Sequence, residues 1–372
     1  MKTFKNTFKT ALVITLALSL ILPLFACKEK TSGSGSGSAS ASGNSLYQQY
    51  FDVFDTVVTL SANGYQTEEF EAACQDLHKE MQRYHHLLDI YHTYDGVTNL
   101  KSINDAAAEG SANHIKVDPE LMHFLKESKK IYNITSGATN IALGSVIDLW
   151  HRERIAALDH PDKAKLPDEA SLKAAGKHIN IDDLVLDTEN NEVSVKDRNL
   201  RLDGGAIAKG YIADRLADYA ISKHYNHFLL NIGGNIKAVG SKDAAGTPWS
   251  VAIQNPEKEA PNPYLLVLNL VDTTLVTSGI YERFYIFHGK CYHHIIDPTT
   301  LFPSDRFKSV SVFTHSSTLA DGLTTGLFNM DLAAGQSLVA KLDDVEAVWV
   351  DHNGKVTYSP GLKKYIKTNY VD

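Results

Sequence analysis

Cysteine and positive charge are both scarce in this sequence. Only three of its 372 residues are cysteines, and none of them forms a CxxC pair. The two cysteines beyond Cys27 are too few for a disulfide framework or a cysteine-rich zinc site. One disulfide between Cys74 and Cys291 is possible, but their separation in sequence favours two unpaired, buried thiols. The 36 basic and 44 acidic side chains give a net charge of -8, which argues against a nucleic-acid groove of clustered cations.

Long apolar runs are absent after the first 30 residues. Before that point, three lysines precede an apolar stretch at residues 11–26, which is short for a membrane-spanning helix of about 20 residues. The pattern predicts a secretory signal peptide over residues 1–26. Its end, Leu24-Phe25-Ala26-Cys27, resembles a bacterial lipobox. This resemblance implies cleavage before Cys27 and attachment of acyl chains such as palmitate, which anchor a protein in a membrane. The alternative is an ordinary signal peptide with an incidental cysteine.

A tether separates the expected anchor from the folded part of the chain. Residues 27–46 begin with the lipidated Cys27 and are rich in glycine and serine, a composition that buries no core. Residues 47–372 are expected to form the folded domain, because 43% apolar residues over the chain allow a sizeable core. We therefore expect an extracytoplasmic, membrane-anchored lipoprotein.

Hydrophobic periodicity predicts helices that are grouped apart from short strands. Apolar residues at helical spacing predict a helix capped by Thr67, and Asp118-Pro119 predicts the start of another. The other expected elements are an extended segment at 48–62, a hairpin within 178–203, a helix after Gly204-Gly205, short strands from Phe228 onward and a helix near 319–330. Because no regular βαβ alternation is visible, the predicted fold class is α+β with antiparallel sheets.

Two glycine-rich segments indicate close approach of the backbone to a ligand. In LRLDGGAIAKGYIAD (199–213), two glycines open a helix whose free amides and positive dipole end suit a phosphate, with Lys209 one turn in. This segment fits neither the Walker A loop nor GxGxxG, and a plain helix entry with a solvated lysine is the alternative. In NIGGN (231–235), paired glycines indicate approach to a ligand or another strand, or a tight turn.

Two further segments carry side chains suited to metal binding and proton transfer. In ADGLTTGLF, Asp321 and Thr325 lie four residues apart, so on a helix both oxygens project from one face and suit Mg2+. The alternative is a helix-capping aspartate beside an unrelated threonine. In HHIIDP, the adjacent His293 and His294 diverge on a strand, which weakens a zinc site. A histidine close to a carboxylate suits proton transfer instead.

Seven segments, taken in order, resemble the ApbE family of FAD:protein FMN transferases over nearly the whole chain from about residue 50. They are FDTVVT, SGATNIALGSVIDLW, LDGGAIAKGYIAD, LLNIGGNI, TSGIYERF, YHHIIDP and ADGLTTGLF. The resemblance implies a T-fold-like α+β architecture of antiparallel sheets and flanking helices. It also implies that the enzyme splits FAD, joins FMN to a threonine or serine of an acceptor flavoprotein with a DxxSGAT-like motif, and releases AMP. The family's usual acceptors are flavin-carrying subunits of ion-pumping redox complexes.

The resemblance also assigns individual residues. It implies that Mg2+ is held by the main-chain carbonyl of Ala206, the carboxylate of Asp321 and the hydroxyl of Thr325. The residues that it implies as contacts of FAD are Phe54, Tyr94, Ala138, Thr139, Asn140, Asp203, Lys209 and Ile295. His294 matches the histidine of the family and is the candidate catalytic base.

Three positions depart from the family pattern. Phe54-Asp55 replaces the usual Met-Gly before the early threonine, and Thr139-Asn140 replaces the usual Phe-Asp after the glycine-rich turn. Leu301 stands where a glycine is expected, which would require a different turn. The metal pair and Lys209 are intact, so we expect FAD binding to survive.

Three other interpretations remain open. Water in place of the acceptor hydroxyl would make the protein a Mg2+-dependent FAD pyrophosphatase that yields FMN and AMP. A lipoprotein that binds FAD without chemistry is a second possibility. Third, NITSGAT (133–139) resembles the acceptor pattern DxxSGAT, so self-modification at Thr139 is conceivable. We prefer the view that this segment is the family's own glycine-rich turn, with Thr139 buried.

Overall fold

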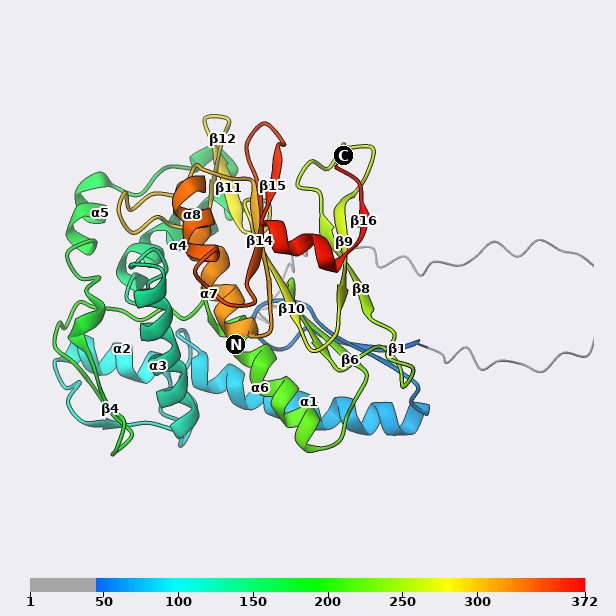
Figure 1. Cartoon of the computed structure of the whole chain (residues 1–372). Coiled ribbons are helices and arrows are strands. Elements are labelled where there is room, and N and C mark those ends of the chain that lie inside the picture. The colour runs from blue at the N-terminus through cyan, green and yellow to red at the C-terminus, as the bar shows by residue number, and fades with distance from the viewer. Residues whose placement is uncertain (1–44, 372) are drawn as a thin grey trace, which may run out of the picture. The chain divides into compact units, whose positions relative to one another are not determined.

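An antiparallel sheet of eight strands forms the centre of the folded part (Figure 1). The computed structural model describes residues 45–371, so the predicted signal peptide, Cys27 and nearly all of the tether lie outside the described residues. In spatial order the strands are β1 (Ser45–Tyr50), β2 (Val58–Asn63), β6 (Phe228–Ile232), β7 (Asn235–Val239), β10 (Thr274–Gly279), β13 (Ser309–Thr314), β14 (Glu346–Val350) and β15 (Val356–Tyr358). Each neighbouring pair is antiparallel, which confirms the predicted α+β class.

Alternating residues of the central strands pack on two different layers. Leu275 of β10 joins a cluster with a small sheet on one face, whereas its neighbour Val276 joins a cluster with helix α7 (Ser317–Phe328) on the other. The small sheet consists of β16 (Ile366–Asn369), β9 (Tyr264–Leu270) and β8 (Trp249–Gln254). Helix α6 (Ala208–Ser222) lies beside α7 and against β7. The two candidate helices are therefore fixed to the same face of the sheet.

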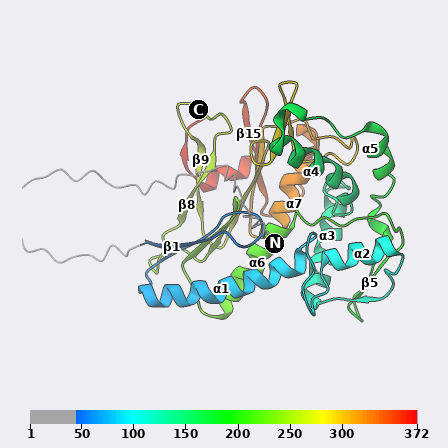
Figure 2. The same ribbon diagram turned by 180° about the vertical axis from the view of Figure 1, so that it is seen from behind.

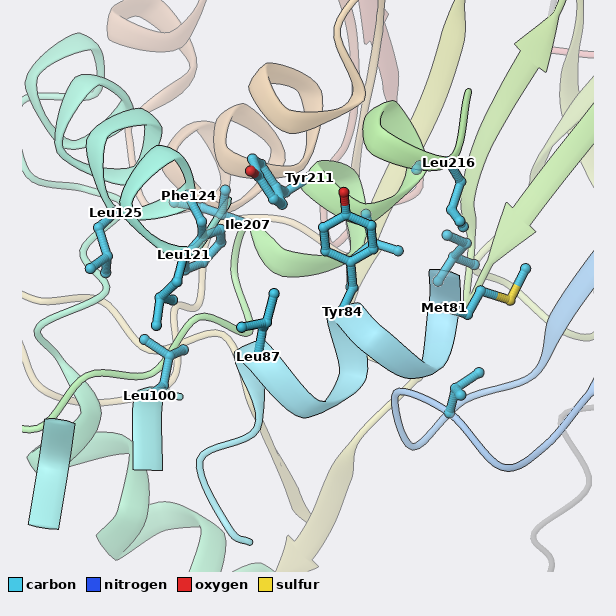
Figure 3. Close-up of a cluster of buried hydrophobic side chains, with 14 of the residues drawn as sticks. Met81, Tyr84, Leu87, Leu100, Leu121, Phe124, Leu125, Ile207, Tyr211 and Leu216 are labelled. Atoms are coloured by element: carbon cyan, nitrogen blue, oxygen red, sulfur yellow. The ribbon is translucent and has the colours of Figure 1, made fainter. Parts of the chain in front are cut away.

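Helix α6 also borders a second group of helices (Figure 3). Tyr84 of α1 (Thr67–Leu88) and Phe124 of α3 (Pro119–Ile134) pack around Tyr211 of α6, with the ring centroids of Phe124 and Tyr211 5.3 Å apart. The same group includes α2 (Leu100–Glu109) and the three-stranded sheet of β3 (Ile115–Lys116), β5 (Glu192–Val195) and β4 (Leu184–Asp187). Since α6 is buried on several sides, its first turn has a well-defined position.

A third group contains Trp150 of α4 (Gly144–Asp159) and the hairpin of β11 (Phe284–Phe287) and β12 (Lys290–His293). The Trp150 ring stacks on Tyr292 at 5.8 Å, so α4 and the hairpin lie side by side in both views (Figures 1 and 2). The remaining elements are η1 (Pro161–Lys163), α5 (Glu169–Ala175), η2 (Ile181–Asp183), α8 (Leu332–Val339) and η3 (Pro360–Tyr365).

Several local predictions can be compared directly with these elements. The Asp118 carboxylate accepts a hydrogen bond from the Glu120 N–H at the start of α3, as expected for a helix cap. Thr67 is the first residue of α1 rather than its cap, because the cap position is Gln66. Residues 51–57 form a turn that divides the predicted extended segment into two strands. Cys74 is buried, Cys291 is half-buried, and both are free thiols. No helix within residues 45–371 is long and apolar enough to span a membrane.

Candidate active site

Helices α6 and α7 are in direct backbone contact at Gly210. A Cβ atom on this residue would lie 2.1 Å from the carbonyl oxygen of Ser317 and 2.6 Å from Cβ of Asp321, so only glycine fits here. The close approach allows the Gly210 N–H to donate to Oδ2 of Asp321 over 2.8 Å. The first turn of α6 and the second turn of α7 are thus held together.

Asp214 of α6 joins the same two helices one turn further along. Its Oδ1 accepts from the N–H of Ser317 at 2.9 Å, and its Oδ2 accepts from the N–H of Thr318 at 2.9 Å. The hydroxyls of Ser316 and Thr318 also donate to Oδ2. Lys237 of β7 pairs with the carboxylate at 3.2 Å, and both side chains are largely buried. Because the positive end of α7 faces this carboxylate, the contact stabilises the helix start. Sequence reasoning did not find Asp214.

The oxygen atoms expected to hold Mg2+ surround the contact at Gly210. Asp321 is only 3% exposed, and its Oδ1 lies 3.6 Å from Nζ of Lys209. A regular helix would direct the Gly210 N–H to the carbonyl of Ala206, four residues earlier. Among residues 45–371 no hydrogen bond reaches that carbonyl, since the N–H points to Asp321 instead. Thr325 follows Asp321 by one turn, and its hydroxyl has no hydrogen-bond partner in the described part of the chain.

This set of donors suits a hard divalent cation. A carboxylate, a main-chain carbonyl and a hydroxyl are all oxygen ligands, which Mg2+ prefers, and Mg2+ commonly completes its shell with water and substrate phosphate. Residues 45–371 contain no cluster of three or more His, Cys, Asp or Glu side chains that could hold a metal ion. The residues at Asp321 therefore fit magnesium and lack the nitrogen and sulfur ligands typical of zinc.

The adjacent histidines diverge, as the sequence predicts. His293, the last residue of β12, is buried; its Nε2–H donates to the carbonyl of Ser304 at 2.7 Å, and its Nδ1 accepts from the Ile295 N–H. Burial lowers the pKa of His293 to about 4. The side chain of His294 is exposed, yet desolvation is the main reason why its pKa lies well below the usual value, followed by the charge of Arg283. His294 is therefore accessible to a ligand, whereas His293 is not.

Asp203 lies in the turn that leads to α6. Its N–H donates to the carbonyl of Ile141 at 2.7 Å, and its Oδ1 accepts from the Gly205 N–H at 2.8 Å. Burial is the main cause of the raised pKa of this carboxyl group. Gly204 is required because a Cβ atom there would lie 2.9 Å from the ring of Phe124. The turn before α6 is thus packed on α3 and has a fixed shape.

The segment Ala138–Asn140 directs its polar side chains into the protein. The Thr139 hydroxyl is buried and donates to the carbonyl of Gly322 in α7 at 2.7 Å. Asn140 is also buried, and its side chain donates to the carbonyl of Ile179 and accepts from the Ala142 N–H. Contacts of this segment with FAD would therefore come from Ala138 and the main chain. The buried Thr139 hydroxyl agrees with the preference against self-modification.

Asn329, at the end of α7, joins two of the predicted FAD-binding segments. Its Nδ2 donates to the carbonyl of Ala138 and to that of Ile296, both at 3.1 Å. The adjacent Ile295 is 4% exposed and packs in the cluster that contains α7, so its side chain offers little surface to a ligand. Sequence reasoning missed Asn329, because its partners are distant in sequence.

Phe54 and Tyr94 each contact one of two adjacent histidines near the end of α1. The Phe54 N–H donates to Nδ1 of His85, and the two rings are 5.8 Å apart. Tyr94 stacks on His86 at 3.8 Å, and its hydroxyl donates to Asp89. These half-buried rings form an aromatic surface that suits a planar heterocycle.

The turn that carries Phe54 packs on the NIGGN segment. A Cβ atom on Gly233 would lie 2.3 Å from Oγ1 of Thr56, and the Gly233 N–H donates to the carbonyl of Val57. Gly233 and Gly234 also form the two-residue turn between β6 and β7, with φ angles of 54° and 92°. The paired glycines thus form the tight turn that the sequence left open, and Gly233 in addition allows the close approach of Thr56. Phe54 and Asp55 have φ angles of 61° and 49°. This is the left-handed region, which glycine adopts most easily, and the family pattern has a glycine at the position of Asp55.

The expectation of a different turn at Leu301 is wrong. Leu301 has a φ angle of 63°, so the left-handed turn that favours glycine is retained with a leucine in it. Its carbonyl accepts from Nε1 of Trp150 at 2.8 Å, and its N–H donates to the carbonyl of Asp297. Its side chain fills the space beside Gly176, where a Cβ atom would lie 2.5 Å from Cδ1 of the leucine. Packing of the side chain therefore offsets the backbone strain.

Two groups of residues thus emerge. Ala206, Lys209, Asp321 and Thr325 lie at the contact between α6 and α7 or within about one helical turn of it. The charge of Lys209 also helps to lower the pKa of His294, after desolvation and the charges of Arg283 and His293. The aromatic group at Phe54 is connected to the β11–β12 hairpin through Arg283, which precedes β11 and whose Nη2 donates to the carbonyl of Asp55 at 3.2 Å. Sequence reasoning had marked TSGIYERF without assigning a role to Arg283.

Comparison with known sequences finds matches to one family over most of the chain. The sequence model of the ApbE family matches residues 54–349. The chain is 32% identical to an FAD:protein FMN transferase of Treponema pallidum over 265 residues, which cover 68% of this chain and 72% of that protein. It is 29% identical to one of Klebsiella pneumoniae over 290 residues, with 78% and 85% covered.

Solved structures show the same fold. The ApbE protein of Thermotoga maritima superimposes with a TM-score of 0.74 at 23% identity, covering 87% of this chain and all of that one. The flavin transferase ApbE of Vibrio cholerae gives a TM-score of 0.71 at 22% identity, with 87% and 99% covered. The arrangement of sheets and helices is therefore shared over most of the described residues.

Proposed function

The chain belongs to the ApbE family, and we propose that it transfers FMN from FAD to a threonine or serine hydroxyl of an acceptor flavoprotein, with release of AMP. The similarity to curated FAD:protein FMN transferases supports the transferase activity. The observation that carries the rest is the contact at Gly210, where the Asp321 carboxylate replaces the Ala206 carbonyl as hydrogen-bond acceptor. This exchange leaves a carbonyl and a carboxylate oxygen available beside Lys209.

Ala206, Asp321 and Thr325 would hold Mg2+. Bound there, the cation supplies charge neutralisation for the diphosphate of FAD, on which phosphoryl transfer strongly depends. Lys209 adds a positive charge from the first turn of α6, and its 3.6 Å contact with Asp321 keeps the ammonium at the same place. The buried position of Asp321 limits competition from water for these charges.

His294 would accept the proton of the acceptor hydroxyl. Because its pKa lies well below the usual value, the imidazole is neutral near pH 7 and has a free nitrogen lone pair. It is accessible, and no described residue occupies it with a hydrogen bond. His293 is unsuited to this role, since both of its ring nitrogens are engaged within the protein.

The flavin-binding residues would come from several separate segments of the chain. Phe54 and Tyr94 offer aromatic faces for stacking. Asp203 offers the polar edge of the turn before α6, and Ala138 offers its main chain. The side chains of Thr139, Asn140 and Ile295 would support this surface from inside.

The amino-terminal sequence supports an extracytoplasmic location. Residues 1–26 would direct export, and lipidated Cys27 would anchor the protein to a membrane through the tether at 27–46. The acceptor would then be an extracytoplasmic flavoprotein with a DxxSGAT-like motif, such as a flavin-carrying subunit of an ion-pumping redox complex.

Mass spectrometry of a candidate acceptor tests this function. The acceptor is incubated with the protein, FAD and Mg2+, and we expect it to gain the mass of FMN at one threonine or serine. A control acceptor with that hydroxyl residue replaced by alanine should gain nothing. Free FMN formed at full rate without acceptor would identify a pyrophosphatase, and FAD bound without turnover would identify a binding protein. FMN attached to Thr139 of the protein itself would contradict the buried position of this residue.

A further inference from the structure

Arg154 of α4 is a half-buried cation without an acidic partner. Its Nη2 donates to Nδ1 of His151 at 3.0 Å, and its buried Nε has no hydrogen-bond partner in the described part of the chain. No carboxylate of residues 45–371 lies within ion-pair distance of it. Leaving a buried guanidinium unpaired costs free energy, so this position is suited to receive an anion.

Arg283 is an exposed cation at the start of the neighbouring hairpin. It precedes β11, the strand that packs beside α4, and it donates only to the main-chain carbonyl of Asp55 at 3.2 Å. It likewise forms no ion pair with a described carboxylate. A guanidinium has five N–H donors, and this single hydrogen bond leaves most of them available.

The charge of Arg283 affects the pKa of Arg154, and the charges of both arginines affect the pKa of His294. Desolvation and then the charge of Arg283 lower the pKa of Arg154. After desolvation, the charge of Arg283 is the largest cause of the lowered pKa of His294, and Arg154 and Lys209 add to it. In the β11–β12 hairpin Phe284 is paired with His293, so Arg283 and His294 directly follow that last pair on the two strands.

Two carboxylates, Asp203 and Asp55, affect neighbours of these arginines but do not pair with the guanidinium groups. Asp203 and Asp55 both act on Tyr91, whose pKa is raised to about 12, mainly by desolvation, and the Tyr91 ring lies 5.7 Å from that of His151. Asp203 accepts from the Gly205 N–H, and burial raises the pKa of its carboxyl group. Neither forms an ion pair with the arginines.

We propose that Arg154 and Arg283 form an anion subsite beside His294, and that it binds a phosphate of the FAD diphosphate. Guanidinium groups match phosphate geometry with paired N–H donors and remain charged in a desolvated site. The assignment rests on the proposed function for the identity of the ligand. The unpaired Nε of Arg154 and the single contact of Arg283 support it independently.

The charge balance of the reaction explains why two more cations are useful. FAD enters with two negative charges on its diphosphate. The acceptor oxygen bonds to the phosphorus of the FMN half, and its proton passes to His294. The bond from that phosphorus to the bridging oxygen breaks, and its electron pair stays on the oxygen, which becomes a terminal oxygen of AMP. One negative charge then remains on the FMN phosphodiester and two on AMP, so the total rises from two to three.

Binding measurements without acceptor test the subsite. Isothermal titration of AMP, FMN and adenosine into the purified protein compares wild type with Arg154→Gln and Arg283→Gln. We expect each substitution to weaken AMP or FMN binding about tenfold or more, a typical effect for a charged hydrogen bond, and to leave adenosine binding unchanged. Whichever nucleotide loses affinity identifies the half of FAD whose phosphate binds.

Arg152→Gln is the matched control, because Arg152 lies on the same helix but is exposed and pairs with Asp148. It should bind all three ligands as wild type does. Arg154→Lys keeps a charge if Arg154→Gln fails to fold, and it should retain intermediate affinity. Unchanged AMP and FMN binding in the variants of Arg154 and Arg283 overturns the subsite, even if FMN transfer is found. If the variants bind AMP or FMN more weakly while the wild-type protein transfers no FMN, the subsite is supported and the proposed function is contradicted.

Discussion

At the scale of single residues, Asp321 has two roles that substitution can separate. One oxygen accepts the Gly210 N–H, and the other faces Lys209 and the expected cation. Asparagine retains an acceptor for the N–H but loses the negative charge that attracts a metal ion. The Asp321→Asn protein should therefore still fold, whereas its FMN transfer should be impaired.

We predict that Asp321→Asn lowers FMN transfer by roughly a hundredfold or more, since a catalytic cation contributes several kcal/mol to such reactions. Transfer rates measured against Mg2+ concentration should show partial recovery at high Mg2+. Asp218→Asn, on the exposed face of α6, is the control and should behave as wild type. A normal rate at low Mg2+ for Asp321→Asn would disprove the metal assignment.

His293 should make stability depend on pH. Its pKa is lowered to about 4 by burial, below the usual 6.5 of an unfolded chain. The unfolded state thus binds the proton more readily, so stability is complete above about pH 6.5 and falls as the pH decreases towards 4. The loss amounts to about 3 kcal/mol at pH 4.

Urea unfolding at pH 7 and pH 4 measures this contribution. The difference in unfolding free energy between pH 7 and pH 4 should be about 3 kcal/mol smaller in His293→Gln. The glutamine can still donate to the Ser304 carbonyl. His160→Gln replaces an exposed histidine at the end of α4 and should keep the wild-type difference. An equal difference in all three proteins would show that His293 titrates normally.

At the scale of the elements, the pairing of α6 with α7 decides the geometry of the site. Gly210 allows the close approach, and Asp214 fixes the start of α7 by accepting four hydrogen bonds while paired with Lys237. Without Asp214, the ammonium of Lys237 would remain largely buried without a carboxylate partner. Such unpaired charges are strongly destabilising.

We predict that Asp214→Ala lowers the free energy of unfolding by about 3 kcal/mol or more. Adding Lys237→Met should recover part of this loss, because it removes the stranded charge. Thermal unfolding of the single and double variants measures both effects, with Asp218→Ala as the exposed control on α6. If the double variant is less stable than Asp214→Ala alone, the buried charge is not the cause.

At the scale of the whole molecule, Cys27 should determine where the protein is found. If lipid chains on Cys27 anchor the exported protein, Cys27→Ser should move it from the membrane fraction to the soluble fraction of cells. Fractionation with an antibody against the folded domain tests this, and FMN transfer in the soluble fraction shows that the domain remains folded. Retention of the variant in the membrane would exclude the lipid anchor.

The sequence alone determined those features whose interactions are local. Asp118-Pro119 begins a helix because the carboxylate reaches the N–H two residues later. Asp321 and Thr325 share a helix face because they are one turn apart. His293 and His294 diverge because neighbouring residues of a strand point to opposite sides. The ordered motifs also determined the family, since they span most of the chain.

Only the tertiary structure decided which of these segments meet. Gly210 and Asp321 are 111 residues apart, and Asp214 contacts residues more than 100 positions away. No local pattern encodes a free Ala206 carbonyl, an unpaired Arg154 or a leucine in a glycine-type turn. These depend on the packing of α4, α6 and α7 with the sheet and the β11–β12 hairpin, because the energy of each contact is gained only when the whole core is assembled.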